Sequence, residues 1–133
     1  MARAYIDAAA SMNPKMAAGA VVFKDEGVDL EFTLFLGEMD NHEAEWATLE
    51  FAVEKALEHS LTSLIVHTDA KIIADSFDRN HVKNPVYRKY FDRIAPHLEK
   101  FDLFIVSWTP RGKNRRADER AKETLYLYRN RRG

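Results

Sequence analysis

The chain contains no cysteine, few glycines and prolines, and no long apolar run. Without cysteine, disulfides, a disulfide-linked partner and thiolate chemistry are excluded, and a reducing cytoplasm is the expected location. No stretch approaches the roughly 18 apolar residues that a membrane span needs. No apolar segment follows a basic start, so a secretion signal is not expected either. The absence of a glycine-rich phosphate loop argues against the nucleotide-hydrolysing proteins that use one.

The composition is that of an ordinary folded protein. Hydrophobic residues make up 46% of the 133 residues and charged residues 31%, which predicts one folded domain over residues 1–133. The net charge is only −1, but nine basic residues stand against three acidic ones from Arg111 to the C-terminus. This segment is either an edge that faces a polyanion or a solvated helix face, and neither reading is favoured by charge alone.

Hydrophobic periodicity and turn residues predict nine elements in the order β-β-β-α-β-α-α-β-α. The predicted strands cover residues 3–7, 20–23, 30–36, 63–68 and 101–108. The predicted helices begin after Asp40, at residue 71, after Pro85 and at residue 114, and the last one runs to about residue 128. Strands that alternate with helices after an antiparallel meander indicate an α/β fold, with a mixed five-stranded sheet flanked by helices.

Two helices carry features with a specific structural expectation. Asp40 is predicted to cap the first helix, with Glu43 three residues later in a carboxylate version of the capping box. Pro96 is predicted to kink or cut the third helix, because a proline inside a helix lacks the amide N–H.

Four acidic residues stand out by position among the 21 in the chain. Asp7 interrupts an otherwise apolar strand, where a buried charge is costly unless it is paired or bound to metal. Asp69 follows an apolar strand, and ligand sites in open α/β sheets favour such strand ends. Glu45 and Asp118 lie near the starts of the first and last helices. If the first and fourth strands are neighbours, the four carboxylates converge and suit two hard divalent cations.

Each of these residues also has a purely structural reading. Asp69 fits a strand-end cap and Asp7 a turn residue. Glu45 and Asp118 fit partners of helix dipoles. Taken singly, each structural reading is favoured, but the four positions together favour a metal site.

Two kinds of side chain near the carboxylates are expected to be structural. His67 is predicted by strand alternation to point away from Asp69. Trp46 and Trp108 are expected to pack against the fold rather than to stack on nucleobases.

Four segments in chain order resemble the motifs of the type 1 ribonuclease H family, and the resemblance covers nearly the whole chain. They are residues 4–7 with Asn13-Pro14 after them, residues 41–46, residues 67–71 and residues 114–118. The sequence is therefore similar to the small stand-alone members of that family.

The resemblance implies an endonuclease that cuts the RNA strand of RNA–DNA hybrids with two divalent ions, Mg²⁺ or Mn²⁺, in one site. It also implies that the catalytic metal ligands are Asp7, Glu45, Asp69 and Asp118. Three residues match family positions that contact the minor groove and sugar hydroxyls of the hybrid: Asn13, Asn41 and Lys71. Three more match the loop that the family places beside the metals: Arg111, Lys113 and Asn114.

The chain departs from the family pattern at two places that bear on activity. Asp40 stands where many members have a threonine that grips a DNA phosphate. Arg111 is the candidate replacement for a histidine that many members carry in the loop before the last helix. These departures favour the alternative of a non-catalytic or weakly active nucleic-acid-binding module. A third reading, a junction resolvase or an exonuclease on the same core, fits the last motif poorly.

Overall fold

Five strands form one mixed sheet in the order β3-β2-β1-β4-β5 in the computed structural model, which describes residues 1–132. The strands are β1 (Ala2–Met12), β2 (Lys15–Asp25), β3 (Val28–Gly37), β4 (Ser63–Thr68) and β5 (Leu103–Trp108). The helices are α1 (Asn41–Glu58), α2 (Lys71–Arg79), α3 (Pro85–Leu98) and α4 (Arg115–Arg132). The predicted element order and fold class are confirmed, while Gly133 of the predicted domain lies outside the described residues.

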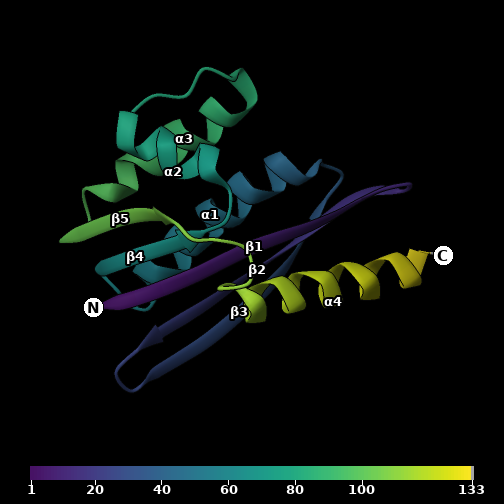
Figure 1. The fold of residues 1–133 in the computed structure, drawn as a ribbon, viewed down its shortest axis with the longest axis horizontal. Coiled ribbons are helices and arrows are strands. Elements are labelled where there is room, and N and C mark those ends of the chain that lie inside the picture. The colour runs from purple at the N-terminus through teal and green to yellow at the C-terminus, as the bar shows by residue number, and fades with distance from the viewer. Residues whose placement is uncertain (133) are drawn as a thin grey trace.

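The helices cover the two faces of the sheet unequally, as Figure 1 shows, with α1, α2 and α3 on one face and α4 on the other. Strand alternation explains the arrangement. Ala4 and Ile6 of β1 belong to the large core beneath α1, which also contains Trp46, Leu49 and Val53 of that helix. Tyr5 and Ala9, with the opposite parity, pack in the smaller clusters beneath α4.

Strand β1 lies at the centre of the sheet and pairs differently on its two sides. It pairs antiparallel with β2 along almost its whole length, from Arg3↔Lys24 to Met12↔Lys15. It pairs parallel with β4 only from Ala2↔Leu64 to Tyr5↔His67. The condition that the first and fourth strands are neighbours is therefore met, and β1 continues beyond the point where β4 ends.

The first helix begins where its capping residue predicts. The side chain of Asp40 accepts a hydrogen bond of 2.8 Å from the backbone N–H of Glu43. The reciprocal half of the capping box is not formed within the described residues, because the Glu43 carboxylate accepts a hydrogen bond of 2.7 Å from the Tyr90 hydroxyl. Asp40 thus has a structural role at the helix start, and Glu43 joins α1 to α3.

Several predicted boundaries were wrong. β1 and β2 extend well beyond the predicted residues 3–7 and 20–23, because the small residues that follow and precede these segments continue the two paired strands. Pro96 does not cut α3, which runs past it to Leu98, because a proline in the last turn leaves little of the helix to disrupt. β5 begins at Leu103 rather than at residue 101, since residues 99–102 form the turn between α3 and β5. α4 extends four residues past the predicted end. No helix in residues 1–132 is long and apolar enough to cross a membrane.

Gly19 of β2 lies against α1 at a point where no side chain fits. A Cβ atom built on Gly19 would occupy the space of the Thr48 hydroxyl and crowd the Leu34 side chain. The Thr48 hydroxyl is itself held in place, since it donates a buried hydrogen bond of 2.7 Å to the Ala44 carbonyl. The missing side chain therefore sets how closely α1 approaches the sheet.

Gly19→Ala is expected to lower the free energy of unfolding by about 1–3 kcal/mol, because overpacking a filled core forces its neighbours to move. Urea-induced unfolding measures the change. Adding Thr48→Ala to this variant is expected to make the double variant more stable than the sum of the two single losses, by about 0.5 kcal/mol or more. Purely additive losses would show that Gly19 and Thr48 do not compete for the same space.

Candidate metal centre

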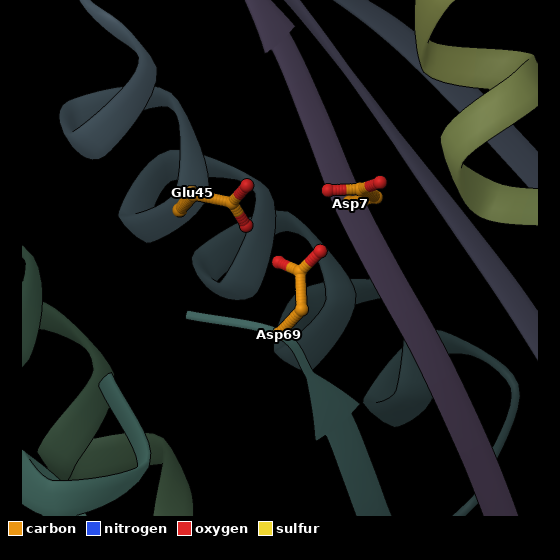
Figure 2. Close-up of side chains that lie close together, drawn as sticks. All are labelled: Asp7, Glu45 and Asp69. Carbon is orange, nitrogen blue, oxygen red and sulfur yellow. The ribbon is translucent and has the colours of Figure 1, made fainter. Parts of the chain in front are cut away.

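Three of the four predicted carboxylates meet at one end of the sheet. Asp7, Glu45 and Asp69 each offer an oxygen, and these oxygens all lie within 4.8 Å of one another. Figure 2 shows the three side chains pointing toward one another from β1, from α1 and from the residue that follows β4. Glu45 and Asp69 lie 38 and 62 positions after Asp7 in the chain, so the cluster joins segments that are distant in the sequence.

The end of β4 creates the space that the cluster occupies. β4 stops at Thr68, and its last pair with β1 is Tyr5↔His67, so Asp7 lies just past the paired region. The chain after β4 turns into α2, with the Thr68 hydroxyl accepting a hydrogen bond of 3.1 Å from the Ala70 N–H. Asp69 is held between these two elements, opposite Asp7. Glu45 reaches the same space from the second turn of α1.

Burial and mutual repulsion make Asp7 and Glu45 hard to ionise in the absence of a cation. Asp7 and Glu45 are each only 5% exposed. Burial, with the nearby charge of Asp69 next, raises the pKa of Asp7 to about 7. Burial, followed by the charges of Asp7 and Asp69, also holds the pKa of Glu45 well above its usual range.

The fourth predicted carboxylate lies beside this cluster but outside it. Asp118 of α4 interacts with Asp7, and it pairs with Lys122 one helical turn later at 2.9 Å. Burial opposes its ionisation, but Lys122, Asp7 and Arg111 together hold the pKa of Asp118 below its usual value. Asp118 is thus readily ionised without an added cation, in contrast to Asp7 and Glu45.

The donor set fits a hard divalent cation. Among residues 1–132, no lysine or arginine forms an ion pair with Asp7, Glu45 or Asp69. One carboxylate oxygen of Glu45 is buried and has no hydrogen-bond donor in the described part of the chain. Oxygen ligands of this kind are those that Mg²⁺ and Mn²⁺ prefer, and a bound cation would remove the repulsion.

The three carboxylates line a cavity of about 280 Å³. Its other lining residues are Ala8, Asn41, Trp108 and Arg111. Arg111 was predicted to lie beside the metals, and Asn41, the first residue of α1, was predicted to contact the hybrid. Trp108 was not, and the expectation that it packs into the fold was wrong, because its side chain is 49% exposed at the end of β5. In the sequence, Trp108 lies directly before the loop that the family resemblance places beside the metals. This position was the signal that could have predicted its place at the cavity.

The remaining predicted substrate residues lie outside this cavity. Asn13 is exposed in the β1–β2 turn, six residues past Asp7, which is about 20 Å along a strand. Lys71 is exposed at the start of α2 and lines a separate hollow between α2 and α3. Lys113 and Asn114 line a hollow on the α4 face of the sheet.

Asn114 has a structural role that the sequence did not reveal. Its side chain is only 3% exposed, and its amide donates a short hydrogen bond to the carbonyl of Ile6. This bond attaches the start of α4 to β1 one residue before Asp7. Asn114 therefore helps to place Asp118 beside Asp7, and its side chain is not presented to the cavity of the three carboxylates.

His67 lies away from the carboxylates, as strand alternation predicts. Its ring stacks on Tyr5 at 4.8 Å, with nitrogens in contact with Arg3 at 2.8 Å and with the Thr109 hydroxyl at 2.9 Å. Burial and then the charge of Arg3 lower its pKa, which favours a neutral imidazole engaged in structural contacts.

Comparisons with known proteins identify relatives of this chain. Residues 6–124 match the sequence profile of the family described as reverse transcriptase-like. The Enterococcus faecalis protein EbsB is 31% identical over 130 residues, which is 96% of each chain. Ribonuclease HI of Halobacterium salinarum is 30% identical over 128 residues, so the match spans 92% of this chain and 63% of that relative.

Solved structures share the fold. The crystal structure of RNase H1 from the same archaeon has a TM-score of 0.85 at 28% identity, with 93% of this chain and 96% of the other covered. LC11-RNase H1, whose crystal structure contains an RNA/DNA hybrid, has a TM-score of 0.83 at 30% identity, with 92% and 95% covered.

The raised pKa of Asp7 predicts how stability depends on pH without metal. The folded protein holds the Asp7 proton more tightly than the unfolded chain does, so this contribution to stability is lost as the pH rises from about 4 to about 7. Asp7→Asn removes it. In the metal-free state the variant is expected to be more stable than the wild type by about 1–3 kcal/mol near pH 8, with no advantage near pH 4.

Chemical denaturation in a chelator at several pH values measures this difference. Asp78→Asn on the exposed side of α2 is the matched control, since it removes one negative charge away from the cluster. A stability difference between wild type and Asp7→Asn that does not vary with pH would contradict the raised pKa.

Proposed function

From the premise that the chain belongs to the reverse transcriptase-like family, as a type 1 ribonuclease H protein, we propose that it hydrolyses the RNA strand of RNA–DNA hybrids. The proposed reaction is a metal-dependent endonucleolytic cleavage of a phosphodiester bond. Ribonuclease HI is the name of one relative, and a second relative was crystallised with an RNA/DNA hybrid.

One observation carries the proposal. Three buried or half-buried carboxylates, which form no ion pair with any of residues 1–132, offer oxygens within 4.8 Å of one another at the strand end where open α/β sheets bind ligands. Such a cluster is costly to a protein that only binds nucleic acid, because the carboxylates repel one another. It is useful where divalent cations must be held next to a phosphate.

The proposed ligands of two divalent ions, Mg²⁺ or Mn²⁺, are the four predicted carboxylates: Asp7, Glu45, Asp69 and Asp118. When bound, such ions activate a water molecule and neutralise the leaving oxygen of a phosphodiester. The chain itself supplies the rigid placement. Asp7 is in the central strand, Glu45 is on a helix packed against it, and Asn114 attaches the Asp118 helix to the same strand.

The proposed substrate contacts favour an extended duplex over a small molecule. Asn41 lines the carboxylate cavity, whereas Asn13 lies in the turn after β1, about 20 Å from Asp7 along the strand. A ligand that touches both must be long. Asparagine side chains both donate and accept hydrogen bonds, which suits the sugar hydroxyls and base edges of a minor groove, and the 2′-hydroxyl is the group that distinguishes RNA from DNA.

Arg111 is the cationic side chain that lines the carboxylate cavity. Its charge already contributes to holding the pKa of Asp118 low. A guanidinium stays protonated at all physiological pH values, so Arg111 cannot transfer a proton. We assign it the role of stabilising negative charge on the phosphate during cleavage.

Cleavage of a labelled RNA–DNA hybrid in Mg²⁺ and in Mn²⁺ tests the proposed function. Double-stranded RNA, double-stranded DNA and single-stranded RNA serve as competing substrates. The RNA strand of the hybrid is expected to be cut only in the presence of the metal. Asp69→Asn is expected to lower the rate at least about a hundredfold, since several kcal/mol of charge stabilisation depend on the ions.

Asp78→Asn is the matched control and is expected to retain full activity, because Asp78 is exposed on α2 away from the cluster. Turnover by Asp69→Asn equal to that of the wild type would refute the proposed centre. A folded wild-type protein that cuts none of these substrates would support the non-catalytic binding module instead.

Arg111→Gln is expected to lower kcat about 10- to 100-fold with little change in KM, because its charge acts chiefly in the transition state. Arg111→Lys keeps the charge and is expected to recover part of the loss. Single-turnover cleavage measures the rates of both variants. Arg88→Gln is the control, because Arg88 is an exposed residue of α3. An equal loss in the lysine and glutamine variants would rule out a purely electrostatic role.

A further inference from the structure

The two edges of the sheet carry different kinds of side chain. β3, at one edge, contains Asp29 and Glu31, whose carboxylates pair with arginines of α4 such as Arg116. β5, at the other edge, has the sequence LFIVSW and contains no charged residue and no proline. Charges and prolines are common means by which an edge strand avoids pairing with another chain. β5 therefore lacks a protection that β3 has.

Part of the β5 backbone points away from the sheet. The Leu103 N–H donates to the Thr62 carbonyl at 3.2 Å, and the Thr109 N–H donates to the end of β4 at 2.8 Å. Successive residues of a strand direct their backbone groups to alternate sides, so the even-numbered residues of β5 point their N–H and C=O groups outward. Within residues 1–132, β4 is the strand that pairs with β5, and no strand pairs with its outer side.

Apolar side chains flank this open edge on both faces of the sheet. On the α4 side, Leu103 and Ile105 are 39% and 43% exposed, because the residues packed beneath α4 come from β1, β2 and β3. On the other side, a hollow of about 440 Å³ lies between β5 and the helices α2 and α3, and we call it the edge hollow. The aromatic and leucine side chains of its lining are Phe77, Phe91, Leu98, Phe101, Leu103 and Phe104.

Trp108 is the large apolar side chain that could fill such a hollow in a second copy. It ends β5 and is 49% exposed. By strand alternation it lies on the same face as Phe104 and Val106, which line the edge hollow. Directly opposed residues of an antiparallel pair share a face, so antiparallel pairing of two β5 strands brings each Trp108 to the edge hollow of the other copy. Pockets of about 300–1,000 Å³ commonly hold small molecules, so the edge hollow has room for an indole ring.

The charges near the two ends of β5 favour an antiparallel arrangement. Asp78 and Asp102 are the charged residues that line the edge hollow, and neither forms an ion pair within residues 1–132. The loop after β5 carries Arg111 and Lys113. Antiparallel pairing brings this basic loop toward the aspartates of a second copy, whereas parallel pairing would bring aspartates toward aspartates.

We propose that the protein forms a two-fold dimer in which β5 pairs antiparallel with β5 of a second copy. The axis passes between the two Ile105 residues, so Leu103 faces Ser107 and Trp108 faces Asp102 at the edge hollow. In this register the outward-pointing, even-numbered residues form the hydrogen-bonded pairs, and one sheet runs through both copies. The proposal is independent of the proposed function, since it rests on β5 and its flanking residues.

Analytical ultracentrifugation from about 1 μM to about 1 mM protein is the first test. One strand pair and two tryptophans form an interface at the small end of the range for specific complexes, so a dimer Kd of roughly 1–100 μM is expected. Ile105→Lys is expected to raise this Kd at least about tenfold, because two like charges would face each other at the axis. Leu127→Lys, an equally apolar and exposed position on α4, is the matched control and is expected to leave the Kd unchanged.

Circular dichroism of each variant establishes that it is folded, and the half-exposed position of Ile105 makes a lysine there tolerable. A wild type that stays monomeric over the whole range would overturn the pairing between copies and leave the β5 edge to a strand of another protein. A dimer that Ile105→Lys and Leu127→Lys weaken equally, or that neither weakens, would overturn the role of β5.

The absence of cysteine from the chain allows a second test, which measures the register. Facing residues at a non-hydrogen-bonded position have Cα atoms about 4.5 Å apart, a separation that a disulfide can span. Under mild oxidation, Ile105→Cys is therefore expected to form a linked dimer at least about tenfold faster than Leu103→Cys or Leu127→Cys. The two Leu103 residues lie about 13 Å apart in the proposed register, four strand positions from facing each other.

Equal rates of linkage in the three cysteine variants would indicate random collision and would overturn the two-fold pairing. Faster linkage of Leu103→Cys than of Ile105→Cys would overturn the axis at Ile105. Both tests are run without metal or nucleic acid, so their results do not depend on whether the protein cleaves a hybrid.

Discussion

The parallel pairing of β1 with β4 is the constraint on which the candidate centre depends. The two strands share a register only up to Tyr5↔His67, after which β4 ends and β1 continues beside β2. This difference in length leaves the side of β1 at Asp7 unpaired, and the chain leaving β4 brings Asp69 to face it. A longer β4 would fill the space with backbone hydrogen bonds, and a shorter one would withdraw Asp69.

Small side chains let the other two carboxylates approach the same strand. Ala44, at the start of α1, packs with Ala8 and Ala17, and it lies directly before Glu45. Ala117 and Ala121 of α4 pack against Ala20 and Val22, on either side of Asp118 in the sequence. Because alanine allows close helix–sheet contact, both helix starts lie near Asp7. The fold thus holds Asp7 and Glu45 close together although their charges repel, and the raised pKa values of these two residues reflect the cost.

Local features of the sequence predicted most of the elements. The nine elements, their order and the capping role of Asp40 follow from periodicity and side-chain chemistry within a few residues, where local preferences are strong. The errors are instructive for the same reason. The effect of Pro96 on α3 depends on where that helix ends, which the local sequence did not show. Glu43 accepts a hydrogen bond from Tyr90 of α3 instead of completing the capping box, and this contact depends on a helix much later in the chain.

By itself the sequence determined which carboxylates stand at the ends of elements, because an acidic residue in or after an apolar strand is visible without knowing the fold. Only the tertiary structure decided which of them meet: Asp7, Glu45 and Asp69 share a cluster, while Asp118 lies beside it and pairs with Lys122. It also decided the roles within the loop before α4, where Arg111 lines the cavity and Asn114 is buried against Ile6. Strand order and helix placement bring these residues together over long sequence separations, and no local pattern in the sequence encodes those distances.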